Sequence, residues 1–248
     1  MLLTNAKSHE FVLFLRESLL STYARVVRLA AITFDHLGTR RQMGALCEVV
    51  ERHGVPATFF VTGERAAEDP AAVKELHDAG YEVGMHGWAH EAWSDLAPAT
   101  ERDLATRATD AIAAATGARP RAFRAPGGAR SEQTTDVLAD LGYTYDASLG
   151  DRMNLARLSP AIAQVPFVWP GVDGYWYLRD EPADPTAVKD AWLSSLTTAD
   201  VFVTICHPEI TGVDDDRLAA LDAVIAAAVA DPTVELCTAG AIAARIPA

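Results

Sequence analysis

The sequence predicts an α/β protein built as one (β/α) barrel. Short apolar runs rich in β-branched residues alternate with stretches of helical periodicity from residue 26 to residue 248. Alternation of this kind builds a parallel sheet, and about eight such units in a chain of this length favour a closed barrel. No linker, repeat or low-complexity segment divides these residues. We therefore expect one domain at 26–248, preceded by an N-terminal extension at 1–25.

Eight short apolar runs predict the strands. Each run is rich in β-branched or aromatic residues, as strands are. They lie at residues 26–34, 57–61, 81–85, 122–124, 143–145, 162–168, 201–206 and 234–237. An open doubly wound sheet is the alternative arrangement. No glycine-rich phosphate-binding motif follows any of the strands, so a nucleotide-binding sheet has no support.

Capping residues and glycines delimit the helices between these strands. One helix is expected to end at Gly54, and Asp69 and Asp184 each cap a helix whose first residue is proline. Thr100 and Asp103 have the spacing of a capping box and predict the start of another helix. The expected helices lie at 43–54, 69–80, 100–117, 131–142, 184–196, 214–229 and 238–245, with a short amphipathic helix at 11–20 in the extension. Residues 147–180 are expected to be irregular apart from one strand.

Composition excludes several functional classes. The chain has 248 residues, and its 21 Lys and Arg against 34 Asp and Glu give a formal net charge of −13, which disfavours binding to nucleic acid or anionic membranes. Three scattered cysteines with no CxxC pair indicate neither a disulfide scaffold nor a cysteine zinc site. Apolar runs are shorter than a membrane span, and the first residues lack the features of a signal peptide. These features predict a cytoplasmic protein; they predict nothing about its oligomeric state.

Polar side chains gather at the carboxyl ends of the predicted strands. Asp35 and His36 follow the first strand, His86 the third, Arg124 ends the fourth and His207 follows the seventh. Barrel enzymes place their chemistry on this face. Cys206 precedes His207, but neighbours along a strand point to opposite sides, so its thiol is expected in the core.

The histidines suggest a metal site. His86 and His90 are four residues apart, a spacing that lets both imidazoles reach one ion from a tight loop. With Asp35 and His36 nearby, the donor set favours Zn²⁺ or another transition metal such as Co, Ni, Mn or Fe over Mg²⁺ or Ca²⁺. Three protein ligands would leave a position for water, as catalytic zinc requires.

Four motifs carry a resemblance to a known family. ITFD at 32–35, HGWAH at 86–90, RAPGG at 124–128 and ICHP at 205–208 resemble, in order and spacing, those of the polysaccharide deacetylase family, which contains the NodB homology domain and is carbohydrate esterase family 4. ATFFVTG at 57–63 is also similar. The resemblance covers roughly residues 28–240. It implies a distorted (β/α) barrel of 7–8 strands that uses a divalent metal to remove N-acetyl, and sometimes N-formyl or ureide, groups.

The resemblance also implies residue roles. Asp35 matches the general base, Arg124 the residue that orients it, and His207 the general acid that protonates the departing amine. His86 and His90 match metal ligands. A backbone N–H near Gly127 or Gly128 would stabilise the oxyanion together with the metal.

Two positions depart from the family pattern. The acidic residue that usually follows the base, and is the third metal ligand, is His36 here. Either His36 completes a three-histidine site, or Asp35 is itself a ligand, or His36 points away. Gly127 stands where the family usually has an aromatic residue, which opens the cleft. The carboxylate partner of His207 is left open among Asp146, Asp151 and Asp173.

Aromatic residues near the predicted site suggest where a substrate binds. Sugar rings stack on such residues, and Trp88, Trp169 and Trp176 are the candidates, together with Gly127 and Gly128. Trp93, Tyr175 and Tyr177 lie in loops or strand ends of the same face.

The predicted activity is metal-dependent N-deacetylation of a small soluble amino-sugar-containing or aminoglycoside-like metabolite. An N-deformylase or a cyclic imide or ureide hydrolase is the alternative enzyme, because HGWAHEAW at 86–93 resembles the intracellular branch of the family. The alternative of another class is a barrel that binds a ligand without catalysis, which the substitution at His36 suggests.

Overall fold

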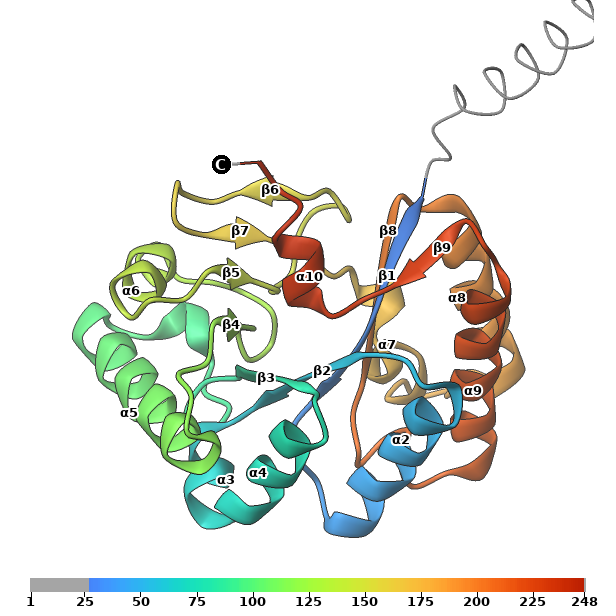
Figure 1. The fold of residues 1–248 in the computed structure, drawn as a ribbon, viewed down its shortest axis with the longest axis horizontal. Coiled ribbons are helices and arrows are strands. Elements are labelled where there is room, and N and C mark those ends of the chain that lie inside the picture. Colours follow the sequence, from blue (N-terminus) through green and yellow to red (C-terminus); the bar gives the residue numbers. More distant parts are fainter. Residues whose placement is uncertain (1–26, 248) are drawn as a thin grey trace, which may run out of the picture.

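One curled sheet forms the centre of the structure (Figure 1). The computed structural model describes residues 27–247. Along the sheet the strand order is β6-β7-β5-β4-β3-β2-β1-β8, and β9 pairs with β1. All pairs are parallel except β6–β7. The strands are β1 (Arg28–Asp35), β2 (Ala57–Val61), β3 (Glu82–Met85), β4 (Ala122–Phe123), β5 (Tyr145–Asp146), β6 (Ala156–Arg157), β7 (Ala163–Gln164), β8 (Val201–Cys206) and β9 (Val234–Leu236).

Isolated bridges continue the sheet across the gap between β7 and β8. Beyond β7, Phe167 bridges Leu149, and Val172 then bridges Ile205 of β8. The segment after β7 therefore contacts the residues that follow β5 on one side and β8 on the other. The predicted distorted (β/α) barrel is confirmed, and its distortion lies at this gap, where one bridge replaces a ladder of strand pairs.

Helices cover the outer face of the sheet (Figure 1), and one short helix, the last of the chain, packs inside its curl. They are α2 (Arg40–His53), α3 (Gly63–Glu68), α4 (Pro70–Asp78), α5 (Pro98–Thr116), α6 (Thr134–Asp140), α7 (Asp173–Tyr177), α8 (Pro185–Thr198), α9 (Asp215–Ala230) and α10 (Ala239–Ala243), with 3₁₀ turns η1 (Trp93–Asp95) and η2 (Trp169–Gly171). Among the described residues, no helix is long and apolar enough to cross a membrane.

Strand residues alternate between an outer and an inner core. Ala30, Ile32 and Phe34 of β1 pack with the helices, and Cys206 lies in the same outer core, as predicted. Leu29 and Ala31 pack in a second cluster inside the curl, which α10 joins through Ala239, Ile242 and Ala243. Since successive side chains of a strand point to opposite faces, the inward positions continue at residues 33 and 35. This alternation sends Asp35 into the barrel.

Most helix boundaries follow the sequence signals. Asp69 and Asp184 cap α4 and α8 by accepting from the backbone N–H groups of Ala72 and Thr186. The capping box predicted at Thr100 and Asp103 is wrong: α5 begins at Pro98 with no side-chain cap, because proline suits the first helical position.

Residues 147–180 contain more structure than predicted. They form β6, η2 and α7, while the strand expected at 162–168 is confined to Ala163–Gln164. The helix expected from 131 begins at Thr134, and α3 was not predicted. The helix expected at 11–20 lies outside the described residues.

A buried carboxylate fixes the segment that follows the HGWAH motif. Glu101 of α5 is fully buried and accepts from Trp93 Nε1 at 2.9 Å and Thr134 Oγ1 at 2.6 Å. It also accepts from Gln133 Nε2 at 2.8 Å. One side chain thereby joins α5, η1 and the start of α6, and η1 begins three residues after His90.

Glu101→Ala is expected to lower the free energy of unfolding by roughly 2–4 kcal/mol, because it leaves buried donors without an acceptor. Chemical denaturation of the variant, with the exposed neighbour Glu132→Ala as control, measures this loss. A loss no larger than that of the control would mean that the Glu101 network does not stabilise this region.

Candidate active site

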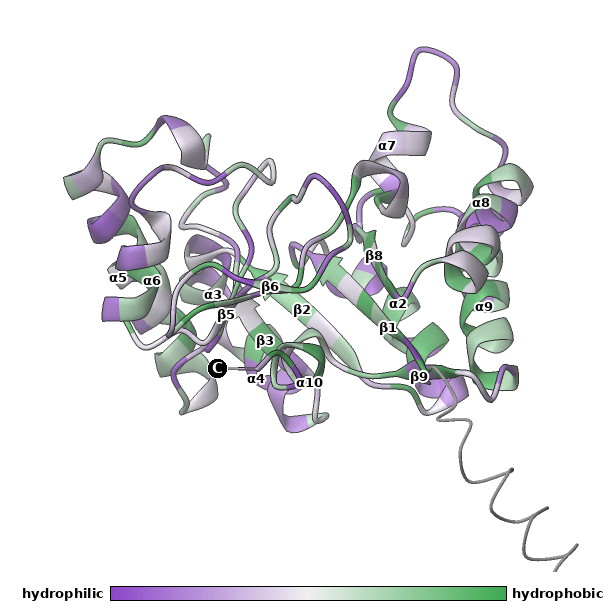
Figure 2. Cartoon of the chain, turned by 90° about the horizontal axis from the view of Figure 1, so that it is seen from above, coloured by the Kyte–Doolittle hydropathy of each residue, from purple (hydrophilic) through white to green (hydrophobic). Residues whose placement is uncertain are grey.

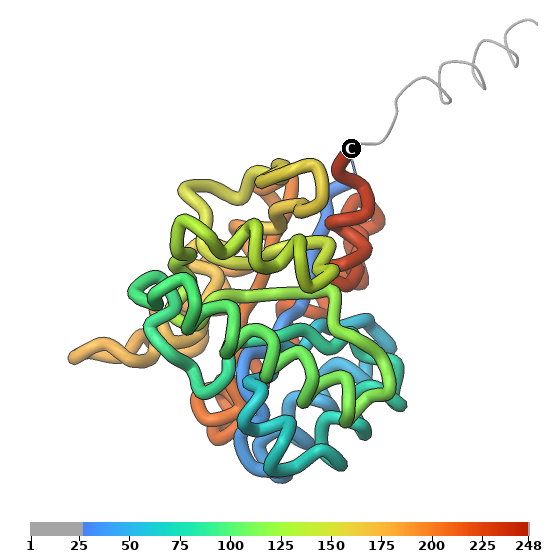
Figure 3. Tube along the Cα trace, turned by 90° about the vertical axis from the view of Figure 1, so that its left-hand side faces the viewer, coloured from blue at the N-terminus to red at the C-terminus, as the bar shows by residue number. Residues whose placement is uncertain are grey.

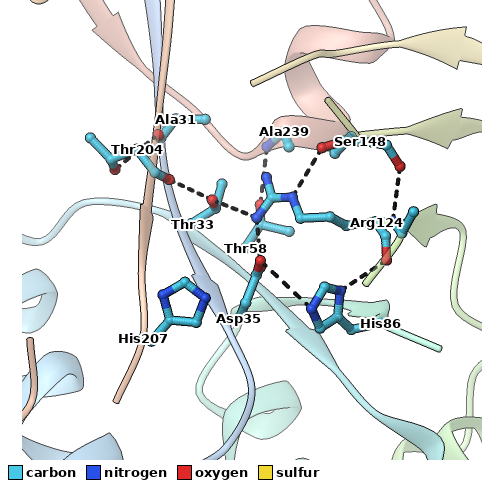
Figure 4. Close-up of polar contacts among 12 residues, drawn as sticks. Ala31, Thr33, Asp35, Thr58, His86, Arg124, Ser148, Thr204, His207 and Ala239 are labelled. Carbon is cyan, nitrogen blue, oxygen red and sulfur yellow. Dashed lines mark hydrogen bonds and ion pairs between the residues drawn. The ribbon is translucent and has the colours of Figure 1, made fainter. Parts of the chain in front are cut away.

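Four inward-facing side chains meet at the carboxyl end of the barrel (Figure 4). Asp35 ends β1, and His86, Arg124 and His207 directly follow β3, β4 and β8. Each follows or ends a strand at the same edge of the parallel sheet, so residues distant in sequence become neighbours. Asp35 lies between the guanidinium of Arg124 and the ring of His86.

Arg124 and Asp35 form a buried ion pair. Arg124 is fully buried, and its Nη1 donates to Asp35 Oδ1 at 2.6 Å and to Thr33 Oγ1 at 2.9 Å. Its Nε donates to the Ala147 carbonyl at 3.0 Å, and its guanidinium carbon lies 4.1 Å from the centroid of the Phe60 ring. Burial alone would raise the pKa of Asp35, but Arg124 and two histidines hold that pKa at about 2. Asp35 is therefore an anion at any physiological pH.

His86 is fixed as a neutral imidazole. It is buried, and its Nδ1 lies 2.9 Å from the carbonyl oxygen of Arg124. A carbonyl can only accept, so Nδ1 carries the proton and Nε2 keeps its lone pair. Nε2 lies 3.8 Å from Asp35 Oδ2. Burial is the main cause that lowers the pKa of His86 to about 3, so the lone pair stays free.

His36, His86 and His90 together form a candidate metal centre. One ring nitrogen from each lies within 4.8 Å of those of the others. His36 and His90 both adopt left-handed backbone conformations, with φ of 69° and 64°. Residues other than glycine seldom adopt this conformation, and when they do it is often at functional sites.

The residues present fit a divalent transition metal. His36 Nε2 is buried and has no hydrogen-bond partner among the described residues. Burial lowers the pKa of His90, with His36 as a second cause, so the neutral, ligating form is favoured. Three neutral imidazoles suit Zn²⁺ and its neighbours in the transition series. Of the sequence alternatives, the geometry favours the three-histidine set.

His207 forms a second polar centre, beside Asp35 on the side away from His86 (Figure 4). Its Nδ1 donates to Asp173 Oδ1 at 2.6 Å, and its backbone N–H donates to Asp173 Oδ2 at 2.7 Å. Thr211 Oγ1 also donates to Oδ2 at 2.7 Å. Burial would lower the pKa of His207, but the hydrogen bond and charge of Asp173 outweigh it and raise this pKa to about 9. His207 is thus protonated at neutral pH.

Asp173 is the carboxylate partner of His207 among the three candidates. Asp146 instead accepts from the Ser148 N–H and pairs with Arg130, and Asp151 is exposed. No sequence signal pointed to Asp173 over the others, because residues 147–180 had no clear pattern.

A cavity of about 540 Å³ contains both centres. Of the predicted substrate-binding residues, Gly127, Gly128 and Trp169 line it. Trp88 and Trp176, the other two predicted residues, do not line this cavity. Trp88 packs against the core, and the guanidinium carbon of Arg107 lies 4.1 Å from the centroid of its ring. Trp176 donates from Nε1 to the Pro170 carbonyl.

The two glycines of the RAPGG motif differ in what they can offer. The Gly128 N–H donates to the Ala125 carbonyl at 2.8 Å, so it is occupied as a turn donor. A Cβ at Gly128 would also lie 2.8 Å from the Phe167 ring. Of the two backbone N–H groups predicted to stabilise the oxyanion, only the one at Gly127 is therefore a candidate.

The structure adds residues that sequence reasoning missed. Glu209 lines the cavity, and its Oε1 lies 2.5 Å from His36 Nδ1. Phe167 and Leu178 also line it, together with Tyr175, which the sequence had placed on the same face. Glu209 lies two residues after His207, so its proximity to the ICHP motif was the available sequence signal. Phe167 and Leu178 had no such signal.

The fold and the site define a (β/α)-barrel protein with a polar, three-histidine centre at the carboxyl ends of its strands. The sequence profile described as polysaccharide deacetylase matches residues 24–145. This match confirms the resemblance to the polysaccharide deacetylase family that the motifs carry.

Individual proteins agree with this assignment. The peptidoglycan deacetylase-like protein FGM2 of Gibberella zeae is 31% identical over 109 residues, which are 43% of this chain and 32% of that protein. A chitooligosaccharide deacetylase of Bradyrhizobium is 40% identical over 113 residues, 45% of this chain and 50% of that protein. The chain thus spans a third to a half of these relatives. A proposed polysaccharide deacetylase from Mycobacterium smegmatis has the same fold, with a TM-score of 0.80 and 24% identity over 91% of this chain and 92% of its own.

Asp173→Asn is expected to lower the pKa of His207 from about 9 toward the ordinary value near 6.5. Because folding raises this pKa, its stabilising contribution is complete below about pH 6.5 and is lost as pH rises through about 9. NMR titration of the His207 ring in metal-free protein measures the shift. Thr211→Val keeps the charge of Asp173 and is the control; equal titration of His207 in both variants would contradict the assigned cause.

Proposed function

We propose that the protein is a metal-dependent hydrolase that removes the N-acetyl group from an acetylated amino sugar. The observation that carries the proposal is the pairing of a fixed anion, Asp35, with a fixed cation, His207, beside one cluster of three histidines. Amide hydrolysis needs both a proton acceptor for the attacking water and a proton donor for the departing nitrogen. The family resemblance and the deacetylases among its relatives support the same reaction.

The residues divide the reaction between them. Asp35 accepts the proton of the water that attacks the acetyl carbonyl, and Arg124 holds its carboxylate in place. A divalent ion held by His36, His86 and His90 would supply Lewis acidity, which acidifies water and polarises the carbonyl. This acidification matters because a carboxylate with a pKa of about 2 is a weak base. His207 donates its Nε2 proton to the nitrogen as the C–N bond breaks, giving acetate and a free amine.

Orientation comes from groups that do not touch the reacting bond. Asp173 holds the His207 ring through Nδ1, which leaves Nε2 as the donor. The Gly127 N–H can donate to the oxygen that gains negative charge. The contact between Asp173 and His207 exists before any substrate binds, so little reorganisation of the His207 ring is needed during the reaction.

We propose a small substrate on the basis of the cavity. Its volume of about 540 Å³ lies within the range of pockets that hold small ligands. N-acetylated monosaccharides and short chitooligosaccharides fit this range. The cytoplasmic location stays a prediction, which fractionation of the source cells would test.

Asp35→Asn in the metal-loaded protein is expected to reduce acetate release about 10²–10⁴-fold, because the variant loses its proton acceptor. Release is measured from N-acetylglucosamine and its oligomers, with the exposed Asp151→Asn as control. Formate and ring-opened products are assayed in parallel from N-formyl and cyclic imide substrates. If no N-acetyl compound releases acetate, the proposed activity is wrong. If only the N-formyl or cyclic imide substrates give product, the protein hydrolyses that other kind of amide bond.

A further inference from the structure

His36 is anchored from two sides. Its backbone N–H donates to the Phe60 carbonyl at 3.0 Å, and its Nδ1 meets Glu209 Oε1 at 2.5 Å. The backbone hydrogen bond fixes the main chain at His36, and the side-chain contact restrains the rotation of its ring. Glu209 is in turn held by a tight turn, in which Ile210 and Thr211 donate their N–H groups to the His207 carbonyl at 3.0 and 2.9 Å.

The contact with Glu209 determines which nitrogen of His36 faces the cluster. A carboxylate accepts hydrogen bonds, so a neutral His36 carries its proton on Nδ1 and presents the Nε2 lone pair. That ring lies 4.8 Å from the ring of His90 and 5.4 Å from the ring of His86, centroid to centroid. With a proton on Nε2 instead, the site would bury an N–H that has no acceptor among the described residues.

We propose that Glu209 is a positioning residue for the metal centre: it holds His36 as the third ligand at the position where the resembling family has an acidic residue. In the family, the negative charge belongs to a residue that contacts the ion directly. Here it belongs to Glu209, which contacts His36 rather than the ion. A carboxylate behind a ligating imidazole fixes its tautomer and increases its basicity, and removal of such a partner commonly weakens metal binding 10–100-fold.

Zinc affinity of metal-stripped full-length protein tests this directly, through competition with a fluorescent chelator. Glu209→Ala is expected to weaken binding 10–100-fold, and Glu209→Gln less, since its amide oxygen can still accept from Nδ1. Glu181→Gln, an exposed site with the same loss of charge, is the control. His36→Ala sets the affinity of a two-histidine site, and thermal melts identify any variant that fails to fold.

Nitrogen-detected NMR of the His36 ring gives a second readout. The proposal expects an Nδ1–H tautomer in the wild type and a mixture of tautomers in Glu209→Ala. Wild-type affinity in a folded Glu209→Ala, or an Nε2–H tautomer of His36 in the wild type, would overturn it. Neither readout depends on catalytic activity.

A second inference comes from an apolar wall, the surface formed by Trp169, Tyr175 and Leu178. Six large apolar side chains are exposed among the described residues, and these three line the cavity that holds the site. Leu178 is 72% exposed. α7, which carries Tyr175, stands at the rim in Figure 2, and the segment that follows it projects from the body in Figure 3. Clustered exposed apolar side chains mark binding surfaces more often than scattered ones do.

The wall is held in place and faces open space. Arg179 lies over the Tyr175 ring at 4.1 Å and donates to the Tyr175 carbonyl at 2.6 Å, which fixes this part of the rim. Across the cavity, a Cβ at Gly127 would meet no atom within 4 Å. Phe167 and Ile210 extend the apolar lining.

We infer that the substrate amide carries an apolar group, such as an aromatic ring or a branched alkyl chain, that packs against the apolar wall. This inference rests on the proposed function. The group could sit on the sugar as an aglycone or replace the methyl of the acyl chain, and the test separates these two sources.

Calorimetric binding to metal-loaded Asp35→Asn protein measures affinity without turnover. The phenyl β-glycoside of N-acetylglucosamine is compared with its methyl glycoside, and N-benzoyl with N-acetyl methyl glucosaminide. In one of the two pairs, the phenyl or benzoyl compound is expected to bind at least about 10-fold tighter than the methyl or acetyl compound, a difference of about 1.4 kcal/mol. Leu178→Ser and Trp169→Ala should reduce this preference, whereas Val229→Ser, an exposed site on α9, should not.

The outcomes separate the two proposals. Equal affinities within both ligand pairs, or a preference that neither wall variant changes, would overturn the apolar wall as a substrate site. A preference for the phenyl glycoside with no acetate released by the wild type would overturn the proposed function alone. A preference for the N-benzoyl ligand would place the apolar group on the acyl chain and overturn the proposed N-acetyl specificity.

Discussion

The site depends on one buried guanidinium. Arg124 is completely enclosed inside the barrel, where an unpaired charge would be very costly, and Asp35 supplies the compensating charge. The same side chain stacks on Phe60 and donates to the carbonyl of Ala147, so it joins β1, β2 and the segment after β5. Its own backbone carbonyl fixes the His86 ring. One residue thus sets the protonation of Asp35 and the tautomer of His86.

Much of this arrangement could be predicted because it depends on local rules. Alternation of strands and helices predicted the barrel, and the two-residue period of a strand is enough to turn Asp35 inward and Cys206 outward. Asp35, His86, Arg124 and His207 needed only the order of strand ends. What could not be predicted depends on contacts made across the fold: Asp173 meets His207 through a 34-residue separation, and Glu209 meets His36 across 173 residues. The direction in which the Trp88 ring points could not be predicted either, because a loop aromatic gives no signal for it.

The substitution at position 36 changes the charge of the centre more than its shape. An acidic ligand would cancel part of the charge of a divalent ion, whereas an imidazole cancels none. Glu209 restores a negative charge behind His36, and the nearby cation His207 lies 5.4 Å from the His36 ring, centroid to centroid. Neutral ligands with a carboxylate behind them form a recognised kind of zinc site, so the exchange is compatible with hydrolysis.

The single bridge that spans the gap in the barrel gives the protein a weak seam. Val172 and Ile205 form that bridge, and the next residue on one side is Asp173, while His207 follows two residues later on the other. Opening the seam would therefore pull the carboxylate from the imidazole and return His207 to ordinary titration. The rest of the barrel, which ladders and helices hold together, need not unfold. Alignment of the His207 ring and closure of the barrel are one structural event, so the local rigidity of this seam, more than global stability, governs how long His207 stays charged.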